Sequence, residues 1–342
     1  ITLSCGSNYK IPLLSLLKSI YLATDPRKVR IWAFAEEDDS DRMEALFEDH
    51  AYDKLYPREN LRVMRFERML DLDMALGIQD HDAALGDHKR GHILAKNQGN
   101  WVRYYMPKIF KEKLGDAAPN QYLYLDCDML VLEDPRNLAN EISRKMGIDA
   151  QNFNSSICLG AAQRPSSKST HWGAGAKALK TMGVQIKAFH GLNAGVLYID
   201  SECWMQTGAV ERILFWLRQN RKQRVFNQGR VGSQVPLYFT FYPAHIPLIP
   251  REGWEEFPQP WPYLMFETKW NSKAKSMESI NNSSIVHFTG IQKPWMHSGL
   301  AVHQHLYSYF NVLEPRTDLF SPEREAERER EREERERERG ER

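Results

Sequence analysis

The stretch NQYLYLDCDMLVLEDP, residues 120–135, joins an apolar run to two carboxylates and carries the first candidate site. Its apolar residues 122–125 predict a buried strand, which runs directly into two carboxylates, Asp126 and Asp128. Alternate residues of a strand point to the same side, so a turn at the strand end can bring both carboxylates to one cation. Such oxygen ligands suit Mg²⁺, Mn²⁺ or Ca²⁺. The competing interpretation is a polar strand end whose carboxylates accept hydrogen bonds from loop amides.

Strand and helix patterns alternate along the chain on both sides of this stretch. Apolar runs predict strands at residues 1–6, 28–35, 61–66, 122–132, 156–162, 192–200 and 283–290. Amphipathic patterns predict helices at residues 11–23, 40–50, 101–114 and 208–220, with Ser40 capping the second and Pro107 inside the third. This alternation predicts an α/β fold with a mostly parallel central sheet and helices on both faces. Ligands of such sheets bind at the carboxyl ends of the strands, where the two carboxylates lie.

The composition describes a globular protein without a strong charge bias. Lys and Arg number 46 against 45 for Asp and Glu, so no long-range field favours nucleic acid or an anionic membrane surface. Four scattered cysteines predict neither a disulfide framework nor a CxxC zinc site. No apolar run approaches the roughly 20 residues that span a bilayer. The chain opens on Ile1 inside a predicted strand, so membrane contact is expected only through an upstream anchor absent from this sequence.

A second motif, IVHFTGIQKPW at residues 285–295, points to the same chemistry. It places His287 in an apolar strand, Gly290 after it and Lys293 three residues further on. The glycine permits close approach of the backbone, and the lysine supplies the point charge that a diphosphate needs. One imidazole added to two carboxylates favours Mn²⁺ over Mg²⁺. The alternative is a core histidine that is satisfied by its neighbours.

At these motifs the chain resembles glycosyltransferase family 8, whose members are retaining, metal-dependent enzymes that use nucleotide sugars. The strand YLYLDCDMLVL matches the family's D-x-D strand, HFTGIQKPW matches its H-x-x-G-x-x-K-P-W, and LNAGVLYID matches its F-N-A-G-V strand. The resemblance covers residues 1 to about 313. It implies the GT-A fold, a Rossmann-like, mostly parallel sheet with helices on both faces. It also implies transfer of a hexose or pentose from a UDP-sugar to a hydroxyl of a glycan or glycoconjugate.

The resemblance assigns site residues by position in the motifs. It implies that Mn²⁺, with Mg²⁺ as the alternative, is held by Asp126, Asp128 and His287. It implies that the diphosphate is bound by Gly290 and Lys293. The nucleotide pocket would take residues from the first strand end, SCGSNY, and from the D-x-D motif: Ser4, Gly6, Asn8, Tyr9, Asp126 and Cys127. Because many relatives carry an acidic residue where this chain has Gly6, the preference for uridine rests on the other positions.

The resemblance also points to residues at the donor sugar and the reaction centre: Arg103, Asn193, Ala194 and Gln228. Relatives often have D-Q-D where this chain has Asn227, Gln228 and Gly229. An amide is a poor nucleophile, so front-face displacement is favoured over a covalent intermediate at Gln228. In that mechanism the cation and Lys293 neutralise the leaving diphosphate. The alternatives are a surface helix charge at Arg103 and a close-packed strand start at residues 193–195.

Other interpretations of function remain open at this stage. The stretch QDHDAALGDHKRGH, residues 79–92, could form the metal site of a hydrolase, an acceptor loop or a solvated loop. A non-catalytic or self-glycosylating sugar-binding relative is a third possibility. Residues 243–270 are rich in Pro and aromatic residues and predict an ordered irregular region. Its aromatic residues could stack on acceptor sugars or belong to the core: Trp254, Phe257, Trp261, Tyr263 and Trp270.

The expected organisation is one transferase domain followed by a tail. Residues 1–320 form the domain, with the donor-binding part at about 1–135 and the acceptor and metal-completing part at about 136–320. Residues 321–342 are a low-complexity Glu/Arg segment that cannot bury a core and is expected to be dispensable. A Golgi or secretory lumen is the expected compartment, with the cytoplasm as the alternative. The partners expected are a UDP-sugar and a glycan acceptor, without nucleic acid.

Overall fold

The computed structural model describes twelve segments of the chain: residues 1–5, 9–50, 52–77, 98–145, 158–163, 192–224, 233–241, 263–266, 268–273, 276–289, 293–296 and 299–310. Several predicted features lie outside these segments. They are the stretch at residues 79–92, residues 243–262, the Glu/Arg tail, Gly6, Asn8, Gln228 and Gly290.

The chain opens with a β-α-β arrangement, as its apolar pattern predicts. The first elements are β1 (Thr2–Ser4), α1 (Lys10–Ala23), β2 (Ile31–Glu36), α2 (Glu37–Asp49), α3 (Tyr52–Leu55) and β3 (Leu61–Phe66). Strand β1 pairs in parallel with β2, and β2 pairs in parallel with β3. The continuous apolar run in β2 is explained by its place inside the sheet, because helices cover both of its faces.

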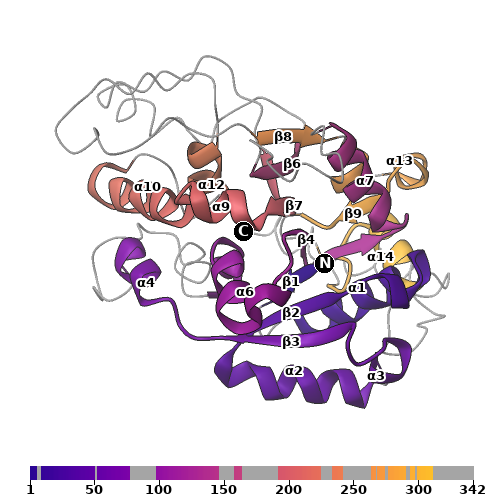
Figure 1. Ribbon diagram of the computed structural model, residues 1–342. Helices are drawn as coiled ribbons and strands as arrows, with labels where there is room; N and C mark the ends of the chain where they lie inside the picture. Colours follow the sequence, from indigo (N-terminus) through magenta and orange to yellow (C-terminus); the bar gives the residue numbers. More distant parts are fainter. Residues whose placement is uncertain are drawn as a thin grey trace, which may run out of the picture.

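One seven-stranded sheet forms the centre of the described part of the chain, in the order β3-β2-β1-β4-β7-β6-β8 (Figure 1). Its remaining strands are β4 (Gln121–Asp126), β6 (Leu159–Gln163), β7 (Leu192–Asp200) and β8 (Tyr263–Phe266). Strand β7 is antiparallel to both of its neighbours, whereas the other pairings are parallel. The predicted mostly parallel sheet is therefore confirmed. Strand β8 falls in the region predicted to be irregular, so the prediction is wrong for those four residues.

The predicted single strand at residues 122–132 is wrong, because the chain breaks at Cys127 and Asp128. Strand β4 ends at Asp126 in the central sheet, and β5 (Met129–Val131) begins a second sheet of two strands. Its antiparallel partner is β9 (Ile285–His287), with Met129 opposite His287. The two carboxylates thus lie where the chain passes from one sheet to the other. Apolar residues on both sides of the break hid it, since both strands are buried.

Helices cover both faces of the central sheet, as predicted. One apolar cluster joins side chains of β2 and β4, such as Phe34 and Tyr122, to helices α4 (Leu70–Leu76), α6 (Met106–Leu114), α9 (Ser201–Gln206), α10 (Ala209–Gln223) and α12 (Gln234–Phe241). The other joins the opposite sides of the same strands, such as Ala33 and Leu123, to α1, α2, α3 and α7 (Pro135–Lys145). A smaller cluster packs β5 and β9 against α13 (Met277–Asn281) and α14 (Ala301–Ser308).

Two predicted helix starts are wrong. Helix α2 begins at Glu37, three residues before Ser40, whose hydroxyl donates to the carbonyl of Glu37 inside the first turn. The helix predicted at residues 101–114 divides into a 3-10 turn at Val102–Tyr104 and the α-helix α6, and another 3-10 turn, Gln98–Asn100, precedes them. Pro107 lies in the first turn of α6, where its missing N–H removes no helical hydrogen bond.

Among the described residues, none of the helices combines the length and the apolar composition that a membrane span needs.

The expectation of no disulfide framework is also wrong, because all four cysteines are paired. Cys5 is bonded to Cys127 across 122 positions of sequence, and Cys158 is bonded to Cys203 across 45. Their Cα atoms lie 5.9 Å and 5.0 Å apart, within the range that a disulfide spans. Spacing along the chain could not reveal the pairs, since their positions come together only when the strands and α9 pack.

Candidate active site

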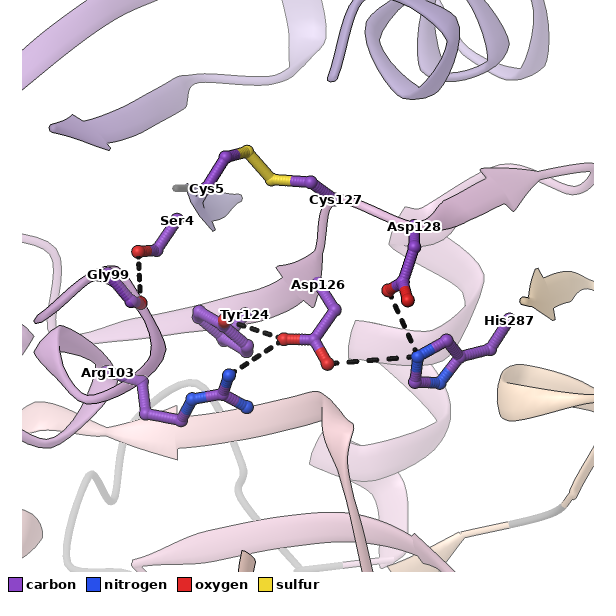
Figure 2. Close-up of a disulfide and its surroundings, with 9 residues drawn as sticks. All are labelled: Ser4, Cys5, Gly99, Arg103, Tyr124, Asp126, Cys127, Asp128 and His287. Atoms are coloured by element: carbon purple, nitrogen blue, oxygen red, sulfur yellow. Dashed lines mark hydrogen bonds and ion pairs between the residues drawn. A yellow bond between two sulfur atoms is a disulfide. The ribbon is translucent and has the colours of Figure 1, made fainter. Parts of the chain in front are cut away.

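Three potential metal ligands meet at the carboxyl end of the central sheet. Asp126 is the last residue of β4, Asp128 precedes β5, and His287 is the last residue of β9. One ligand atom from each lies within 4.8 Å of the others. His287 Nε2 is 3.2 Å from Asp128 Oδ1 and 3.8 Å from Asp126 Oδ2 (Figure 2). The pairing of β5 with β9 produces this convergence, because it sets Met129, the neighbour of Asp128, opposite His287.

The three side chains fit a divalent cation. Neighbouring ligands on an octahedral ion with bonds of about 2.1 Å lie about 3 Å apart, close to the two distances found here. The set contains two carboxylates and one imidazole, which suits Mn²⁺ or Mg²⁺ better than a soft metal. His287 and Asp128 are largely withdrawn from solvent, whereas the Asp126 side chain keeps a quarter of its surface exposed. The group can therefore hold a cation that still faces a ligand from solution.

Asp128 is held in its charged form by two neighbours. Lys293 Nζ forms an ion pair with Asp128 Oδ2 and donates to the carbonyl of Phe288 at 2.7 Å. Burial by itself would raise the pKa of the Asp128 carboxyl, but the charge and hydrogen bonds of His287 and Lys293 outweigh it. The pKa of Asp128 consequently lies well below its usual value. The second motif thus contacts the first directly, through both its histidine and its lysine.

Asp126 is oriented by two residues on its other side. Its Oδ1 accepts hydrogen bonds from the Tyr124 hydroxyl at 2.7 Å and from Arg103 Nη2 at 2.9 Å. Its Oδ2 then faces His287 (Figure 2). Tyr124 was not singled out from the sequence, although its place two residues before Asp126 puts both side chains on the same face of β4.

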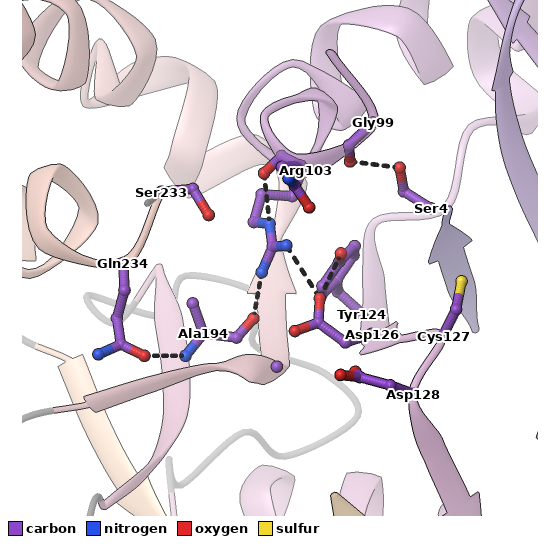
Figure 3. Close-up of polar contacts among 12 residues, drawn as sticks. Ser4, Gly99, Arg103, Tyr124, Asp126, Cys127, Asp128, Ala194, Ser233 and Gln234 are labelled. Carbon is purple, nitrogen blue, oxygen red and sulfur yellow. Dashed lines mark hydrogen bonds and ion pairs between the residues drawn. The ribbon is translucent and has the colours of Figure 1, made fainter. Parts of the chain in front are cut away.

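Arg103 is buried, so the interpretation as a surface helix charge is wrong. Its side chain is 5% exposed, and its guanidinium lies 4.4 Å from the centre of the Tyr124 ring. It donates to Asp126 and to the carbonyls of Asn100 and Ala194 (Figure 3). Burial alone would lower the pKa of Arg103, but the charge of Asp126 outweighs it and the pKa is raised. Arg103 thereby connects the D-x-D motif to the start of β7, and its contact with a donor sugar stays a prediction.

The NAG segment at the start of β7 lies against this network. The Ala194 carbonyl accepts from Arg103, and the Ala194 N–H donates to Gln234 Oε1 at 3.3 Å. Asn193 Oδ1 accepts from the N–H of Gly195 at 2.8 Å. A Cβ atom at Gly195 would lie 2.3 Å from His287 Cε1 and 2.6 Å from Met129 Cε. Gly195 therefore lets the start of β7 pack directly against the His287 ring, in agreement with the interpretation of residues 193–195 as a close-packed strand start.

The predicted nucleotide pocket is described in part. The Ser4 hydroxyl donates to the carbonyl of Gly99. Tyr9 packs edge-on against Trp295, with ring centres 6.0 Å apart, and Lys293 Nζ lies 5.9 Å from the Tyr9 ring. The Cys127 side chain is bonded to Cys5, which leaves its backbone for the predicted nucleotide contact. The roles of Gly6, Asn8, Gly290 and Gln228 stay predictions, since these residues lie outside the described segments.

Trp270 belongs to the core and does not offer a platform to an acceptor sugar. It is 1% exposed, and its indole N–H donates to Glu141 Oε2 at 2.8 Å. The other proposed stacking residues lie outside the described segments or, for Tyr263, have no described side chain. The histidines and aspartates predicted as a rival metal site also lie outside them: Asp80, His81, Asp82, Asp87, His88 and His92.

Comparisons with known proteins agree with this site. A model of the family "Glycosyl transferase family 8" matches residues 1–299. General stress protein A of Bacillus subtilis (strain 168) is 24% identical over 252 residues, which cover 72% of this chain and 77% of that protein. The structure of the galactosyltransferase LgtC with donor and acceptor sugar analogs is similar, with a TM-score of 0.54, 14% identity and coverage of 91% of this chain and 94% of that one.

Two further solved structures agree in fold. The bifunctional glycosyltransferase WbbM has a TM-score of 0.53 and 12% identity, and the match covers 92% of this chain and 49% of WbbM. An active-site mutant of LgtC reaches a TM-score of 0.56 at 14% identity. At these identities the structural matches show the fold, and the family match carries the assignment. The chain belongs to glycosyl transferase family 8 and is a glycosyltransferase with a GT-A fold.

Proposed function

We propose that the chain is a retaining transferase that moves a hexose or pentose from a UDP-sugar to a hydroxyl of a glycan or glycoconjugate. The observation that carries the proposal is the convergence of Asp126, Asp128 and His287 beside Lys293. Two carboxylates, an imidazole and a buried ammonium suit a cation and a diphosphate together. LgtC, which shares the fold, has been solved with donor and acceptor sugar analogs, which supports the two kinds of substrate.

Mn²⁺ is the proposed cation, and Mg²⁺ is the alternative. Asp126, Asp128 and His287 would hold it, and the imidazole favours the softer Mn²⁺. When bound, the cation supplies positive charge to the diphosphate oxygens. Tyr124 and Arg103 keep one oxygen of Asp126 engaged, so the other is presented to the site. With Oδ1 held by two hydrogen bonds, the Asp126 carboxylate has little freedom to reorient.

Lys293 supplies the second positive charge. It is 7% exposed and is held between Asp128 and the Phe288 carbonyl. A buried ammonium interacts more strongly with a developing charge than an exposed one, because water screens it less. We assign to Lys293 the stabilisation of the diphosphate as it leaves.

Retention is proposed to follow from front-face displacement. The acceptor oxygen forms a bond to the anomeric carbon on the face from which the diphosphate departs. The bond between that carbon and the β-phosphate oxygen breaks, and the proton of the acceptor hydroxyl passes to the leaving diphosphate. No protein carboxylate needs to become a nucleophile. This agrees with the sequence here, where relatives often have D-Q-D and this chain keeps Gln228 between Asn227 and Gly229.

A secretory or Golgi lumen is the proposed compartment, with the cytoplasm as the alternative. Two disulfides that use all four cysteines support an oxidising environment. Reactivity of the purified native protein toward a thiol reagent, before and after a reducing agent, tests this directly. Four reactive thiols in protein isolated under a thiol-blocking agent would point to the cytoplasm.

Hydrolysis and transfer measured over a panel of UDP-sugars test the proposed activity. One UDP-sugar together with Mn²⁺ should raise the Tm more than either does alone. Asp128→Asn should lower the rate by at least about 100-fold, because it removes a charge that the cation needs. Asp116→Asn, which changes an exposed carboxylate elsewhere, is the matched control. Release of phosphate from simple esters without a sugar nucleotide would instead indicate a hydrolase, and sugar binding without turnover a non-catalytic relative.

A further inference from the structure

The disulfide between Cys5 and Cys127 lies inside the candidate metal site. Cys127 is the middle residue of the D-x-D motif, and Cys5 directly follows β1. Figure 2 shows the bridge on one side of the chain and the carboxylates of Asp126 and Asp128 on the other, directed toward His287. The peptide that carries both ligands is thus covalently attached to a neighbouring strand.

The bridge acts where the hydrogen bonds of the sheet end. Strands β1 and β4 pair as far as Ser4 and Asp126, and the two cysteines are the next residues of each strand. Beyond them the chain leaves the central sheet and rejoins a sheet at Met129, opposite His287. The N–H of Phe288 donates to the carbonyl of Asp128 at 2.9 Å. The bridge is therefore the fixed point on the β1 side of the connection.

The side-chain contacts of Asp126 and Asp128 differ in whether they can persist when a cation binds. Asp126 is held through one oxygen, by Tyr124 and Arg103. The partners of Asp128 are His287, which is itself a candidate ligand, and Lys293, a cation that competes with the metal for the same carboxylate. A cation bound between Asp128 Oδ1 and His287 Nε2 replaces their direct contact, and the position of Asp128 then depends more on the backbone that carries it.

We propose that the Cys5–Cys127 disulfide is a positioning element that holds the Asp126–Asp128 peptide in the geometry required for a divalent cation. The inference rests on the proposed metal site. Reduction by a dithiol weakens cation binding: the dithiol gives two electrons and two protons and becomes a disulfide, while the Cys5–Cys127 bond breaks to two thiols. Cys5 is partly exposed, and Cys127 is buried.

The second disulfide is a matched control within the same chain. Cys158 precedes β6 and Cys203 lies in α9, where both belong to the apolar cluster with Leu159 and Trp204. Neither residue belongs to the group of candidate ligands. Removing this bridge also raises the conformational entropy of the unfolded chain and lowers stability. Comparing the two variants therefore separates an effect on stability from an effect on the metal site.

The experiment compares Mn²⁺ affinity in three proteins, measured by electron paramagnetic resonance of free Mn²⁺ well below each Tm. The Kd for Mn²⁺ should rise by about 10-fold or more in C5A/C127A, a loss typical of displaced ligand supports. It should equal the wild-type value in C158A/C203A, although both variants melt at a lower temperature. Equal Mn²⁺ affinity in C5A/C127A and the wild type would overturn the proposal.

A dithiol titration provides a second measurement that does not depend on the folding of C5A/C127A. In the C158A/C203A protein the only cysteines left are Cys5 and Cys127. Reduction with dithiothreitol, followed by its removal, should weaken Mn²⁺ binding, and reoxidation should restore it. Unchanged affinity in protein whose two thiols are shown to be free would reject the proposal.

The two levels of inference fail in different ways. A wild-type protein that binds no Mn²⁺ and turns over no UDP-sugar overturns the proposed function and this inference with it. A wild-type protein that binds Mn²⁺ and transfers sugar, with C5A/C127A equal to it in both, overturns this inference alone. For C5A/C127A the expected pattern is a raised KM for Mn²⁺ with kcat largely recovered at saturating Mn²⁺.

Discussion

Asp126 illustrates how one residue acquires its role from its neighbours. A carboxylate at a strand end can rotate, and either oxygen can turn to a cation. The Tyr124 hydroxyl and Arg103 both donate to Oδ1, which leaves Oδ2 toward His287. Hydrogen bonds to a ligating side chain raise metal affinity because they reduce the freedom that binding must remove. Tyr124 and Arg103 are positioning residues in this sense.

Tyr124→Phe tests this role at the scale of one atom. The change keeps the ring beneath Arg103 and removes the hydroxyl, so the Kd for Mn²⁺ should rise about 10-fold. Mn²⁺ titration of the folded protein measures it. Tyr122→Phe is the control, because its buried hydroxyl has no hydrogen-bond partner among the described residues. Equal Mn²⁺ affinity in the two variants would remove Tyr124 from the positioning network.

At the scale of elements, the break between β4 and β5 assembles the site. A continuous strand would carry Asp128 away along the central sheet. Because the chain turns at Cys127 and enters the small sheet, Asp128 instead lies beside β9 and within reach of His287. The start of β7 then packs against the His287 ring through a glycine, so four strands from two sheets contribute to one site.

Gly195→Ala tests how closely β7 and β9 must approach. The added methyl would lie 2.3 Å from His287 Cε1, too close for any real contact, so the ring must move from the carboxylates. The Kd for Mn²⁺ should rise by about 10-fold or more, and the Tm should change little. His287→Ala provides the background control, because Gly195→Ala should cost no further affinity once the ring is absent. A full additional loss in that background would place the effect elsewhere, for example at Met129.

At the scale of the whole molecule, the two apolar clusters on opposite faces of the central sheet hold the donor-binding strands in place. Their members come from described segments between Leu3 and Ile285. The single domain expected for residues 1–320 stays a prediction. The two disulfides join segments within this body. The Glu/Arg tail at residues 321–342 is different in composition, since it offers almost no apolar surface to bury.

Removal of residues 321–342 should leave stability and activity unchanged. Charged residues that bury no apolar area add little to the free energy of unfolding. The midpoint of urea denaturation and the transfer rate with Mn²⁺ check this against the full chain. A lowered midpoint would indicate that the tail packs on the domain, and a lowered rate with an unchanged midpoint would indicate an acceptor-binding arm.

The metal-binding hypothesis for residues 122–128 and 285–293 was accessible from sequence because its signals are local. Apolar runs predict strands, and acidic or basic residues directly after them are exposed at strand ends, where ligands bind. The alternation of strands and helices likewise predicted the mostly parallel sheet. The sequence pattern did not predict where β4 ends and β5 begins, because both strands are buried and equally apolar.

Local sequence patterns were enough to predict the alternation of strands and helices, the mostly parallel sheet and the two motifs that meet at its edge. Tertiary structure was needed to show which distant residues become partners: Cys5 with Cys127, Arg103 with Asp126, and Gly195 with the His287 ring. The difference lies in how far apart along the chain the interacting residues are. Hydrophobic periodicity is set by neighbours a few positions away, whereas these contacts join residues between 23 and 122 positions apart that meet only in the folded chain.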